Sequence, residues 1–321
     1  MNYNVGIIGL GMIGASMLAE FAEHPDFTVS AVWDLNDAIN KQIKSQYPAV
    51  RIASDADTLI NDPDIDLVYI ATPPVTHVTY GLQVIAAGKA LLCEKPLAID
   101  MDEGWELVEA AEAAGVATAI NFIYGAGPLV DVITAQLDSG RLGELLNIEV
   151  RYQFPSWPLP NQLSAAAWIT QRDQGGMVRE MFSHFVYLLM RLFGDIEIIS
   201  TVLQYPEGEN AAESYVLSSL EVEGLPIWLM GGVGGPMAPR ESELTIHGSR
   251  ASLRIGGLRE LTISAGDGWQ PVLMPTGAPT PAQARLTELA RRLAGEETLL
   301  PDLRDGLAVQ EVIEEMLSDE E

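Results

Sequence analysis

The sequence predicts an α/β fold built on a doubly wound parallel sheet, with a second domain after it. Two observations predict the sheet. A glycine-rich turn, GLGMIG, follows the first apolar run, and apolar runs then alternate with helix-like stretches through the first third of the chain. The length points to the second domain, because 321 residues exceed the size at which one core usually stops growing. We expect one domain over residues 1–121 and another over residues 122–321.

The first elements are a strand over residues 4–9 and a helix over residues 15–24, with glycines at G-x-G-x-x-G spacing between them. Gly9 permits a tight turn, Gly11 lets a phosphate approach the backbone, and Gly14 permits close packing of helix on strand. The helix N-terminus offers N–H groups and the positive end of its dipole to phosphates. The pattern predicts a dinucleotide site, the alternative being a glycine turn in another α/β protein. The predicted cofactor turn comprises Gly9, Gly11, Met12, Ile13 and Gly14.

The next apolar run, FTVSAVWD, ends in Asp34, twenty residues after Gly14. An acidic side chain at this distance accepts hydrogen bonds from a ribose 2′-hydroxyl. It would repel a 2′-phosphate, and the residues that follow, LNDAIN, contain no arginine to bind one. The sequence therefore favours NAD over NADP.

Further apolar runs at residues 66–74, 89–96 and 115–122 alternate with helix-like runs at residues 77–88 and 102–115. Such alternation predicts right-handed βαβ units and a parallel sheet, whose ligands bind at the carboxyl ends of the strands. Several polar or proline residues stand where these strands end. The residues expected on this rim are Asp34, Thr72, Pro73, Lys95 and Asn121.

Lys95 is the last of only four lysines in the chain, and it stands between Glu94 and Pro96. A proline disfavours helical geometry in the residue before it. We therefore expect Lys95 to be held in an extended conformation at the rim of the sheet. The alternative is a surface lysine in a βα loop.

Composition excludes several classes of partner. The formal charge of −27 disfavours nucleic acid and anionic membranes, because the field of the protein repels phosphate. The single cysteine, Cys93, cannot form an internal disulfide, the N-terminus lacks the basic region of a signal peptide, and no run approaches the roughly 18 to 20 apolar residues that span a bilayer. We expect a cytoplasmic protein. The four histidines and the cysteine show no metal-ligand spacing, so no metal is expected.

A second candidate site lies in the helical pattern of residues 178–192. At 100° per residue the apolar side chains gather on one broad face. Glu180, His184, Tyr187 and Arg191 follow at offsets 0, 4, 7 and 11 and form one narrow polar stripe just after the Gln-Gly-Gly segment. The stripe predicts a surface that faces a ligand, and the alternative is the solvent-facing side of an amphipathic helix.

The motifs GLGMIG, ATPPVTH and LCEKPLA, in this order and spacing, resemble those of the Gfo/Idh/MocA oxidoreductases. SGRLGELLNIEVRY, the segment from residue 168 to 195, ELTIHGSRASLRI and LPDLRDGLAVQEVIEEML extend the resemblance over nearly the whole chain. It implies a Rossmann domain followed by an α+β domain with a large, mostly antiparallel open sheet, which often supports homodimers or homotetramers. It also allows the C-terminal helix to pack back on the first domain.

The resemblance implies hydride transfer between NAD or NADP and a secondary alcohol or ketone of a sugar, polyol or keto analogue. It implies that Lys95 lies beside the nicotinamide, with Glu94 next to it, and that His184 assists proton transfer. Glu180 stands where the family commonly has aspartate. Tyr187 departs from the family, because aspartate is usual at that position. We expect His77 to support the cofactor loop, and Trp168, Arg172 and Arg191 to line the substrate pocket.

Oxidation of a secondary alcohol needs a hydride acceptor, a base and stabilisation of the oxygen. Lys95 serves as the base or as a cation that polarises the oxygen, and His184 relays the proton because imidazole titrates near neutral pH. Glu180 orients His184, and Tyr187 donates a proton or stacks on a ring-shaped substrate. Two alternatives stay open: an NAD-dependent glycosidase on the same scaffold, and a non-catalytic NAD-binding sensor.

Overall fold

A computed structural model of the chain describes residues 2–208, 210–234, 241–257 and 259–318. It divides into two compact units, Met1–Ala126 with Pro279–Ala308, and Gly127–Ala278 with Val309–Glu321. The sequence led us to expect one boundary, between residues 121 and 122. The first unit also contains residues 279–308, which follow the second unit's sheet in the sequence. Apolar side chains of this segment, among them Leu286 and Leu289, pack in the core of the first unit. Among the helices in the described ranges, none is both long and apolar enough to cross a bilayer.

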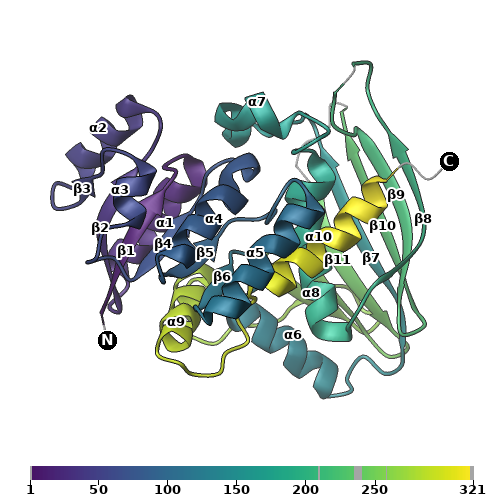
Figure 1. Cartoon of the computed structure of the whole chain (residues 1–321). Helices are drawn as coiled ribbons and strands as arrows, with labels where there is room; N and C mark the ends of the chain where they lie inside the picture. Colours follow the sequence, from purple (N-terminus) through teal and green to yellow (C-terminus); the bar gives the residue numbers. More distant parts are fainter. Residues whose placement is uncertain (1, 209, 235–240, 258, 319–321) are drawn as a thin grey trace. The chain divides into compact units, whose positions relative to one another are not determined.

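The first unit is built on a parallel sheet with the strand order β3-β2-β1-β4-β5-β6, which confirms the predicted doubly wound fold (Figure 1). The order reverses direction at β1, and such a switch point marks where ligands bind in open α/β sheets. The strands are β1 (Tyr3–Ile8), β2 (Phe27–Trp33), β3 (Arg51–Ile52), β4 (Leu67–Ile70), β5 (Ala90–Cys93) and β6 (Thr118–Ile120).

The helices of this unit cover the sheet, and α1 and the late helix α9 share one apolar core with β1, β2 and β4. Capping residues set the helix ends. The Asp100 side chain accepts from the Glu103 N–H at the start of α5, and Gly115, at φ +64°, ends it. That left-handed residue makes the following strand, β6, begin later than the expected residue 115. The helices are α1 (Met12–Glu23), α2 (Asp37–Gln46), α3 (Ala56–Ile60), the short η1 (Pro74–Thr76), α4 (His77–Ala86), α5 (Met101–Ala114) and α9 (Pro281–Leu293).

The second unit is built on a larger sheet with the order β14-β13-β12-β11-β7-β10-β9-β8. Its pairs are antiparallel except for β7 with β10, so the expected mostly antiparallel sheet is confirmed. The strands are β7 (Leu145–Phe154), β8 (Glu197–Gln204), β9 (Tyr215–Val222), β10 (Leu225–Val233), β11 (Glu241–Gly248), β12 (Ser252–Gly256), β13 (Glu260–Ser264) and β14 (Gln270–Pro271).

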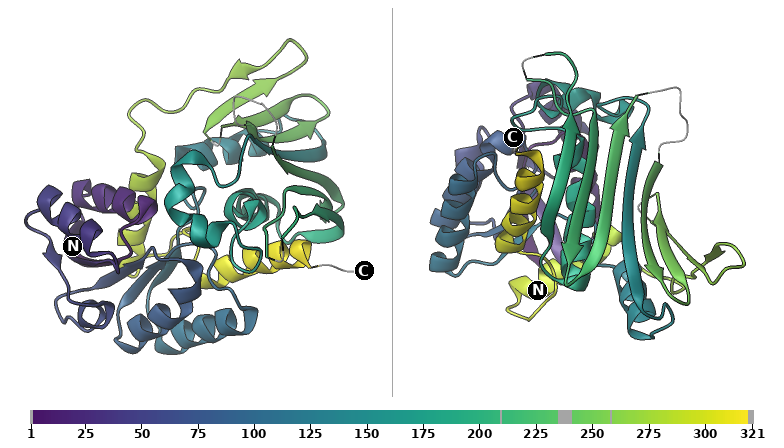
Figure 2. Two further views of the ribbon diagram at one scale, coloured as in Figure 1. Left: turned by 90° about the horizontal axis from the view of Figure 1, so that it is seen from above. Right: turned by 90° about the vertical axis from the view of Figure 1, so that its right-hand side faces the viewer.

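One face of this sheet packs on helices, as the alternating burial of β7 and β9 shows. The right-hand view of Figure 2 shows the opposite face, where no helix of the second unit lies in front of the strands. The helical segments are α6 (Pro128–Asp138), η2 (Pro160–Ala165), α7 (Ala166–Ile169), the π turn η3 (Val178–Phe182) and α8 (Ser183–Phe193). Helix α10 (Leu303–Leu317) contributes its first residues to the first unit and the rest to the second.

Candidate functional site

The glycine turn after β1 has the geometry that its spacing predicts. Gly9 has φ +91°, and a Cβ atom there would lie 2.5 Å from the carbonyl oxygen of Ala71. A Cβ atom on Gly14 would lie 2.0 Å from the carbonyl oxygen of Gly9. Gly11 differs from both, because a Cβ atom there would meet nothing within 4 Å. Two of the glycines are therefore required by the turn itself, while the third leaves open space at the start of α1.

Helix α1 begins directly after Gly11, and no side chain caps its N-terminus. Its first turn contains no acidic residue. Met12 and Ile13, the first two residues of the helix, are 42% and 43% exposed although both are apolar. An uncapped helix N-terminus attracts anionic groups. The open space beside Gly11 and the start of α1 thus fit a pyrophosphate.

Asp34 follows β2 and ties two backbone segments together. Its Oδ2 accepts a hydrogen bond from the Leu10 N–H at 2.7 Å, and its Oδ1 accepts from the Asn36 N–H at 2.8 Å. The Asn40 side chain holds the Asp34 backbone on both sides, at 3.0 and 2.7 Å. A carboxylate oxygen has more than one acceptor site, so these bonds leave capacity for ribose hydroxyls. The carboxylate is fixed next to the glycine turn.

His77, the first residue of α4, is fully buried and lies between two loops. Its Nε2 is 2.8 Å from the carbonyl oxygen of Thr72, and its Nδ1 is 2.8 Å from that of Pro96. Burial lowers its pKa, the two carbonyls oppose that shift, and the charge of Lys95 lowers it further. A neutral imidazole has one N–H and donates to only one of the two. His77 therefore joins the loop after β4, which contains Thr72 and Pro73, to the loop after β5.

Glu94 lies at the carboxyl end of β5 inside a buried hydrogen-bond network. The Tyr69 hydroxyl and the Asn121 Nδ2 both donate to its Oε1, the second at 2.6 Å. Burial raises the pKa of Glu94, and the two donors together with the charges of Lys95 and Arg285 oppose that rise. Lys95 itself is half-buried beside this network. The structure thus brings Gly9, Asp34, Thr72, Pro73, Lys95 and Asn121 to one rim of the parallel sheet.

In the second unit, a glycine pair leads into the predicted polar helix. A Cβ atom on Gly175 would lie 2.4 Å from the carbonyl oxygen of Ile169. Gly176 has φ +103°, and a Cβ atom there would meet the Glu213 carboxylate at 2.5 Å. Glu213 is 2% exposed and accepts from the Val178 N–H at 2.6 Å, and its burial raises its pKa. A buried carboxylate therefore holds the start of the helix, and only glycines fit around it.

The sequence predicted one regular helix over residues 178–192, and this prediction is wrong for its first turn. Residues Val178–Phe182 form a π turn, and α8 starts only at Ser183. Because an i→i+5 turn is wider than an α turn, the 100° rule does not describe the spacing between Glu180 and His184. Irregular turns of this type are frequent at functional sites.

The polar side chains of this segment are nevertheless shielded from water. Glu180 and His184 are each 9% exposed and Tyr187 is 5% exposed, so the solvent-facing alternative is wrong for these three. Arg191 is half-buried, and its Nη1 donates to the Tyr187 hydroxyl at 3.3 Å. Buried polar groups of different types on one helix are typical of a functional site rather than of a surface.

Trp168 and Arg172 lie just before the glycine pair. Trp168, in α7, is half-buried. The guanidinium carbon of Arg172 lies 3.9 Å from the ring centroid of Tyr205, and its carbonyl oxygen accepts from Arg179 at 2.5 Å. Arg179 in turn donates to both carboxylate oxygens of Glu314. The Arg172 side chain is thus held by a stacking contact, and its backbone by a hydrogen bond from Arg179.

Three residues that the sequence did not single out take part in these arrangements. Tyr69 and Arg285 belong to the network around Glu94, and Glu213 holds the π turn. Tyr69 stands in an apolar strand. Arg285 is 191 residues from Glu94, and Glu213 is 35 residues from Val178. No local pattern marks such long-range contacts.

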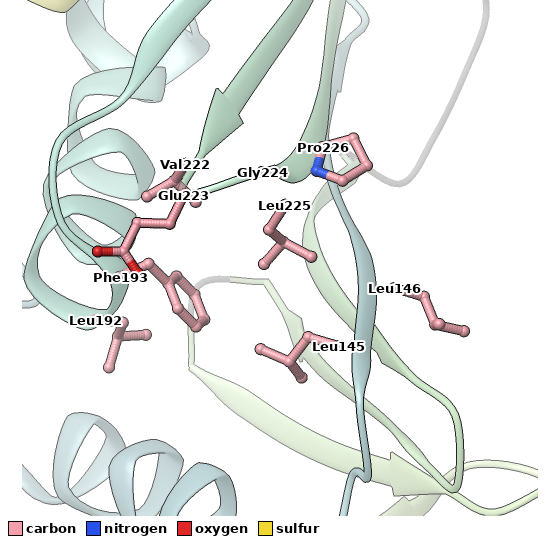
Figure 3. A pocket seen from close by; sticks show the side chains of 9 residues that line it. All are labelled: Leu145, Leu146, Leu192, Phe193, Val222, Glu223, Gly224, Leu225 and Pro226. Carbon is pink, nitrogen blue, oxygen red and sulfur yellow. The ribbon is translucent and has the colours of Figure 1, made fainter.

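A cavity of about 380 Å³ lies elsewhere in the second unit (Figure 3). None of the predicted site residues lines it, so it is not the candidate site. Its lining comprises Leu145, Leu146, Leu192, Phe193, Val222, Glu223, Gly224, Leu225 and Pro226. Among the residues that the structure describes, no group of three or more histidines, cysteines or acidic residues could hold a metal ion.

Comparison with known proteins gives matches to both parts of the chain. Residues 3–122 match the Gfo/Idh/MocA oxidoreductase family, NAD-binding Rossmann fold, and residues 134–320 match the C-terminal alpha/beta domain of the same family. The chain is 27% identical over 213 residues to levoglucosan dehydrogenase of Pseudarthrobacter phenanthrenivorans, a match that covers 63% of this chain and 54% of that protein. It is 34% identical over 158 residues to inositol 2-dehydrogenase of Acidothermus cellulolyticus, covering 48% and 46%. The matches span about half the length of these two relatives.

Two solved structures share the fold. A levoglucosan dehydrogenase in complex with NADH and L-sorbose has a TM-score of 0.83 at 20% identity, with 98% of this chain and 96% of that chain covered. A 3-ketoreductase from Actinomadura kijaniata in complex with NADP and TDP-benzene has a TM-score of 0.84 at 20% identity, again with 98% and 96% covered. One binds NADH and the other NADP, so these neighbours leave the choice of cofactor open.

Proposed function

This chain belongs to the Gfo/Idh/MocA oxidoreductase family, and on that premise we propose that it transfers a hydride between NAD and a secondary alcohol or ketone of a sugar, polyol or keto analogue. The observation that carries the proposal is the shared rim of the parallel sheet, where the open glycine turn, Asp34 and Lys95 follow the carboxyl ends of β1, β2 and β5. The relatives named levoglucosan dehydrogenase and inositol 2-dehydrogenase support the substrate class. When bound, the nicotinamide supplies the hydride acceptor or donor.

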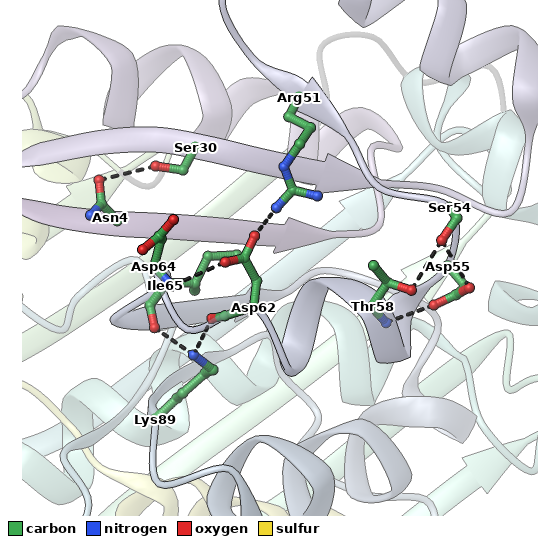
Figure 4. Close-up of polar contacts among 10 residues, drawn as sticks. All are labelled: Asn4, Ser30, Arg51, Ser54, Asp55, Thr58, Asp62, Asp64, Ile65 and Lys89. Carbon is green, nitrogen blue, oxygen red and sulfur yellow. Dashed lines mark hydrogen bonds and ion pairs between the residues drawn. The ribbon is translucent and has the colours of Figure 1, made fainter.

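Asp34 and its surroundings support NAD rather than NADP. The carboxylate disfavours a 2′-phosphate at the position where the ribose would lie. Two cations of the segment after Asp34 are already engaged: Arg51 pairs with Asp62, as Figure 4 shows, and the Lys44 Nζ donates to the carbonyl oxygens of Pro48 and Val50 at 2.9 Å. Lys89, also drawn in Figure 4, donates to two carbonyl oxygens at 2.6 Å.

In the proposed mechanism, Lys95 takes the hydroxyl proton of the substrate or polarises its oxygen. His77 and Pro96 fix the loop that carries it, through the 2.8 Å contact of the imidazole with the Pro96 carbonyl. His184 relays the proton, and Glu180 orients His184. Their burial supports this, because a general acid or base is tuned by a shielded environment.

Tyr187 distinguishes this chain within the proposed chemistry. A phenol offers one hydroxyl in place of a carboxylate, and here its oxygen is held by Arg191. We propose that Tyr187, with Trp168, Arg172 and Arg191, shapes a pocket for a ring-shaped substrate, and that the chain accepts a narrower set of polyols than enzymes with a carboxylate there.

We also propose that the chain forms homodimers or homotetramers through the open face of the larger sheet. Met230, Leu217 and Val202 are neighbours in register across β10, β9 and β8, and they are 38%, 41% and 58% exposed. Trp228 on the same face is 44% exposed. A contiguous apolar surface of this type is typical of a protein interface. The buried free thiol of Cys93 supports a cytoplasmic location.

The direct test is a panel of inositols, anhydrosugars, sugars, sugar acids and keto compounds with NAD and with NADP, followed by NADH absorbance. Net NADH formation on a polyol or sugar with NAD supports the proposal. A glycosidase would convert a glycoside without net NADH, and a sensor would bind NAD but turn over no member of the panel. Either outcome would replace the proposed reaction.

A further inference from the structure

One arginine of α9, Arg285, contacts residues that follow the carboxyl end of β6 in the first unit. Arg285 is 9% exposed, and its Nε donates to the Asn121 Oδ1 at 2.9 Å. Its Nη1 donates to the carbonyl oxygen of Ile123 at 3.2 Å. The same Asn121 side chain also contacts Glu94, because its Nδ2 donates to the Glu94 Oε1 at 2.6 Å. A chain of hydrogen bonds therefore runs from Arg285 through Asn121 to Glu94, the neighbour of Lys95.

The chemistry of this chain of bonds fixes the direction of the amide. A guanidinium only donates, so the Asn121 atom that faces Arg285 must be the oxygen. The NH₂ group of the same amide then faces Glu94 and donates to it. If Arg285 were replaced by a side chain without donors, the amide oxygen would lose the donor that faces it, and of this pair only Glu94 would still favour the orientation.

The orientation of the Asn121 amide affects the pKa of Glu94, together with the charges around it. The groups that face Glu94 are Tyr69 from β4, Cys93 and Lys95 from its own strand end, the neutral Asn121 from β6, and Arg285 from α9. Burial raises the pKa of Glu94, while the Asn121 donor and the Arg285 charge oppose the rise. Buried carboxylates stay ionised only when donors and cations compensate the lost water. Arg285 supplies one compensating positive charge, and through its bond to the Asn121 oxygen it orients the Asn121 NH₂ group toward Glu94.

Docking of α9 on the sheet does not depend on Arg285 alone. Arg292 of the same helix donates to the carbonyl oxygens of Thr118, at 2.6 Å, and of Leu300. Leu286 and Leu289 are buried in the core of the unit. These contacts hold α9 on the sheet without Arg285. The hydrogen bond from Arg285 to Asn121 is therefore not needed to attach the helix.

We propose that Arg285 is a positioning residue that orients the Asn121 amide and thereby keeps Glu94 ionised and fixed beside Lys95. The inference rests on the proposed function, in which Lys95 acts on the substrate oxygen. It adds a part of the site that lies 190 residues further along the chain than Lys95. The segment that returns to the first unit thus serves the reaction as well as the fold.

The test compares Arg285→Met, which removes the donors, with Arg285→Lys, which keeps a charge and donors. Arg291→Met is the matched control, because Arg291 lies on the same helix and pairs at the surface with Glu288 and Glu296. We expect Arg285→Met to lower kcat by about 10- to 100-fold with less than a threefold change in the KM for NAD. Arg285→Lys should recover at least a third of the lost activity, and Arg291→Met should match the wild type.

A second readout follows Glu94 itself, by ¹³C NMR of its carboxyl carbon with the signal assigned through Glu94→Gln. Loss of Arg285 should raise the pKa of Glu94 further, because an opposing charge and an oriented donor disappear. The acidic limb of the kcat/KM profile should move to higher pH with it. Unchanged Glu94 titration in Arg285→Met overturns the inference, whether kcat is retained or falls together with the melting temperature. If the wild type oxidises no alcohol, the proposed function fails, while the Glu94 titration still decides the role of Arg285.

Discussion

The carboxylate of Asp34 accepts a hydrogen bond from the backbone N–H of Leu10 at 2.7 Å. This bond joins the end of β2 to the glycine turn after β1, so the group that would bind ribose and the turn that would bind pyrophosphate are fixed together. The link depends on one side chain. It gives the dinucleotide site a pre-formed geometry, and several measurements follow from it.

Replacing Asp34 with serine should weaken NAD binding about tenfold, since hydrogen bonds to a charged group are lost. The preference for NAD over NADP should fall by at least the same factor, because the repulsion of a 2′-phosphate disappears. Titration of protein fluorescence with each cofactor measures both effects. Asp37→Ser, in the first turn of α2, is the control and should keep both affinities. A preference that survives in Asp34→Ser would remove Asp34 from cofactor selection.

Alanine at Gly11 and at Gly14 should have opposite consequences. Gly11→Ala meets no atom within 4 Å, so the melting temperature should stay near that of the wild type while NAD affinity is lost. Gly14→Ala brings a Cβ atom to 2.0 Å from the Gly9 oxygen, and overpacking of this kind should cost about 3 kcal/mol of unfolding free energy or more. Thermal unfolding and NAD titration of the two variants separate the roles. Normal NAD affinity in Gly11→Ala would contradict a phosphate position beside that glycine.

His77 should make the stability of the fold depend on pH. Its pKa is lowered by burial, whereas the imidazole of an unfolded chain titrates near pH 6.5. Below about pH 7 the unfolded state therefore binds more protons, and the unfolding free energy falls as the pH decreases. His77→Gln should remove this part of the fall between pH 7 and pH 5, as urea denaturation would measure. His24, whose pKa is also lowered, stays in both proteins as background. Equal slopes in the two proteins would show that His77 carries no such linkage.

The open sheet face should lose its self-association when a charge is introduced. Met230→Glu places a carboxylate in the row of Met230, Leu217 and Val202, and burying it in an interface would cost more than the interface contributes. Light scattering after gel filtration should then report a monomer. Leu273→Glu is the control, because Leu273 is 86% exposed away from this row. An oligomer that persists in Met230→Glu would assign the interface to another surface.

The rim of the first unit could be predicted from the sequence because short motifs determine it. Gly9, Gly14 and Asp34 have the spacing of one strand–turn–helix–strand unit, and the alternation of apolar strands and helices indicates the rest of the parallel sheet. The roles of Lys95, His184 and the other site residues remain proposals. What the structure adds for them is burial and contacts, such as the 3.3 Å bond between Arg191 and Tyr187.

Other features depend on contacts between segments that are distant in the sequence, and no local sequence pattern predicts them. The first residue of the π turn at Val178–Phe182 donates its N–H to Glu213, which lies 35 residues away in the sequence. Arg285 reaches Asn121 across 164 residues. The return of residues 279–308 to the first unit has the same origin, because apolar residues of α9 pack on a sheet formed much earlier in the chain. A single sequence records such pairings only as separate residues.

The most direct measurement is single-turnover hydride transfer by Lys95→Met, with any alcohol that the wild type oxidises. Lys41→Met, an exposed lysine on α2, is the control. The account predicts that Lys95→Met melts within a few degrees of the wild type, binds NAD with an affinity within about threefold, and forms NADH at least 100-fold more slowly. A transfer rate equal to that of the wild type would show that Lys95 does not act on the substrate and would contradict the proposed mechanism.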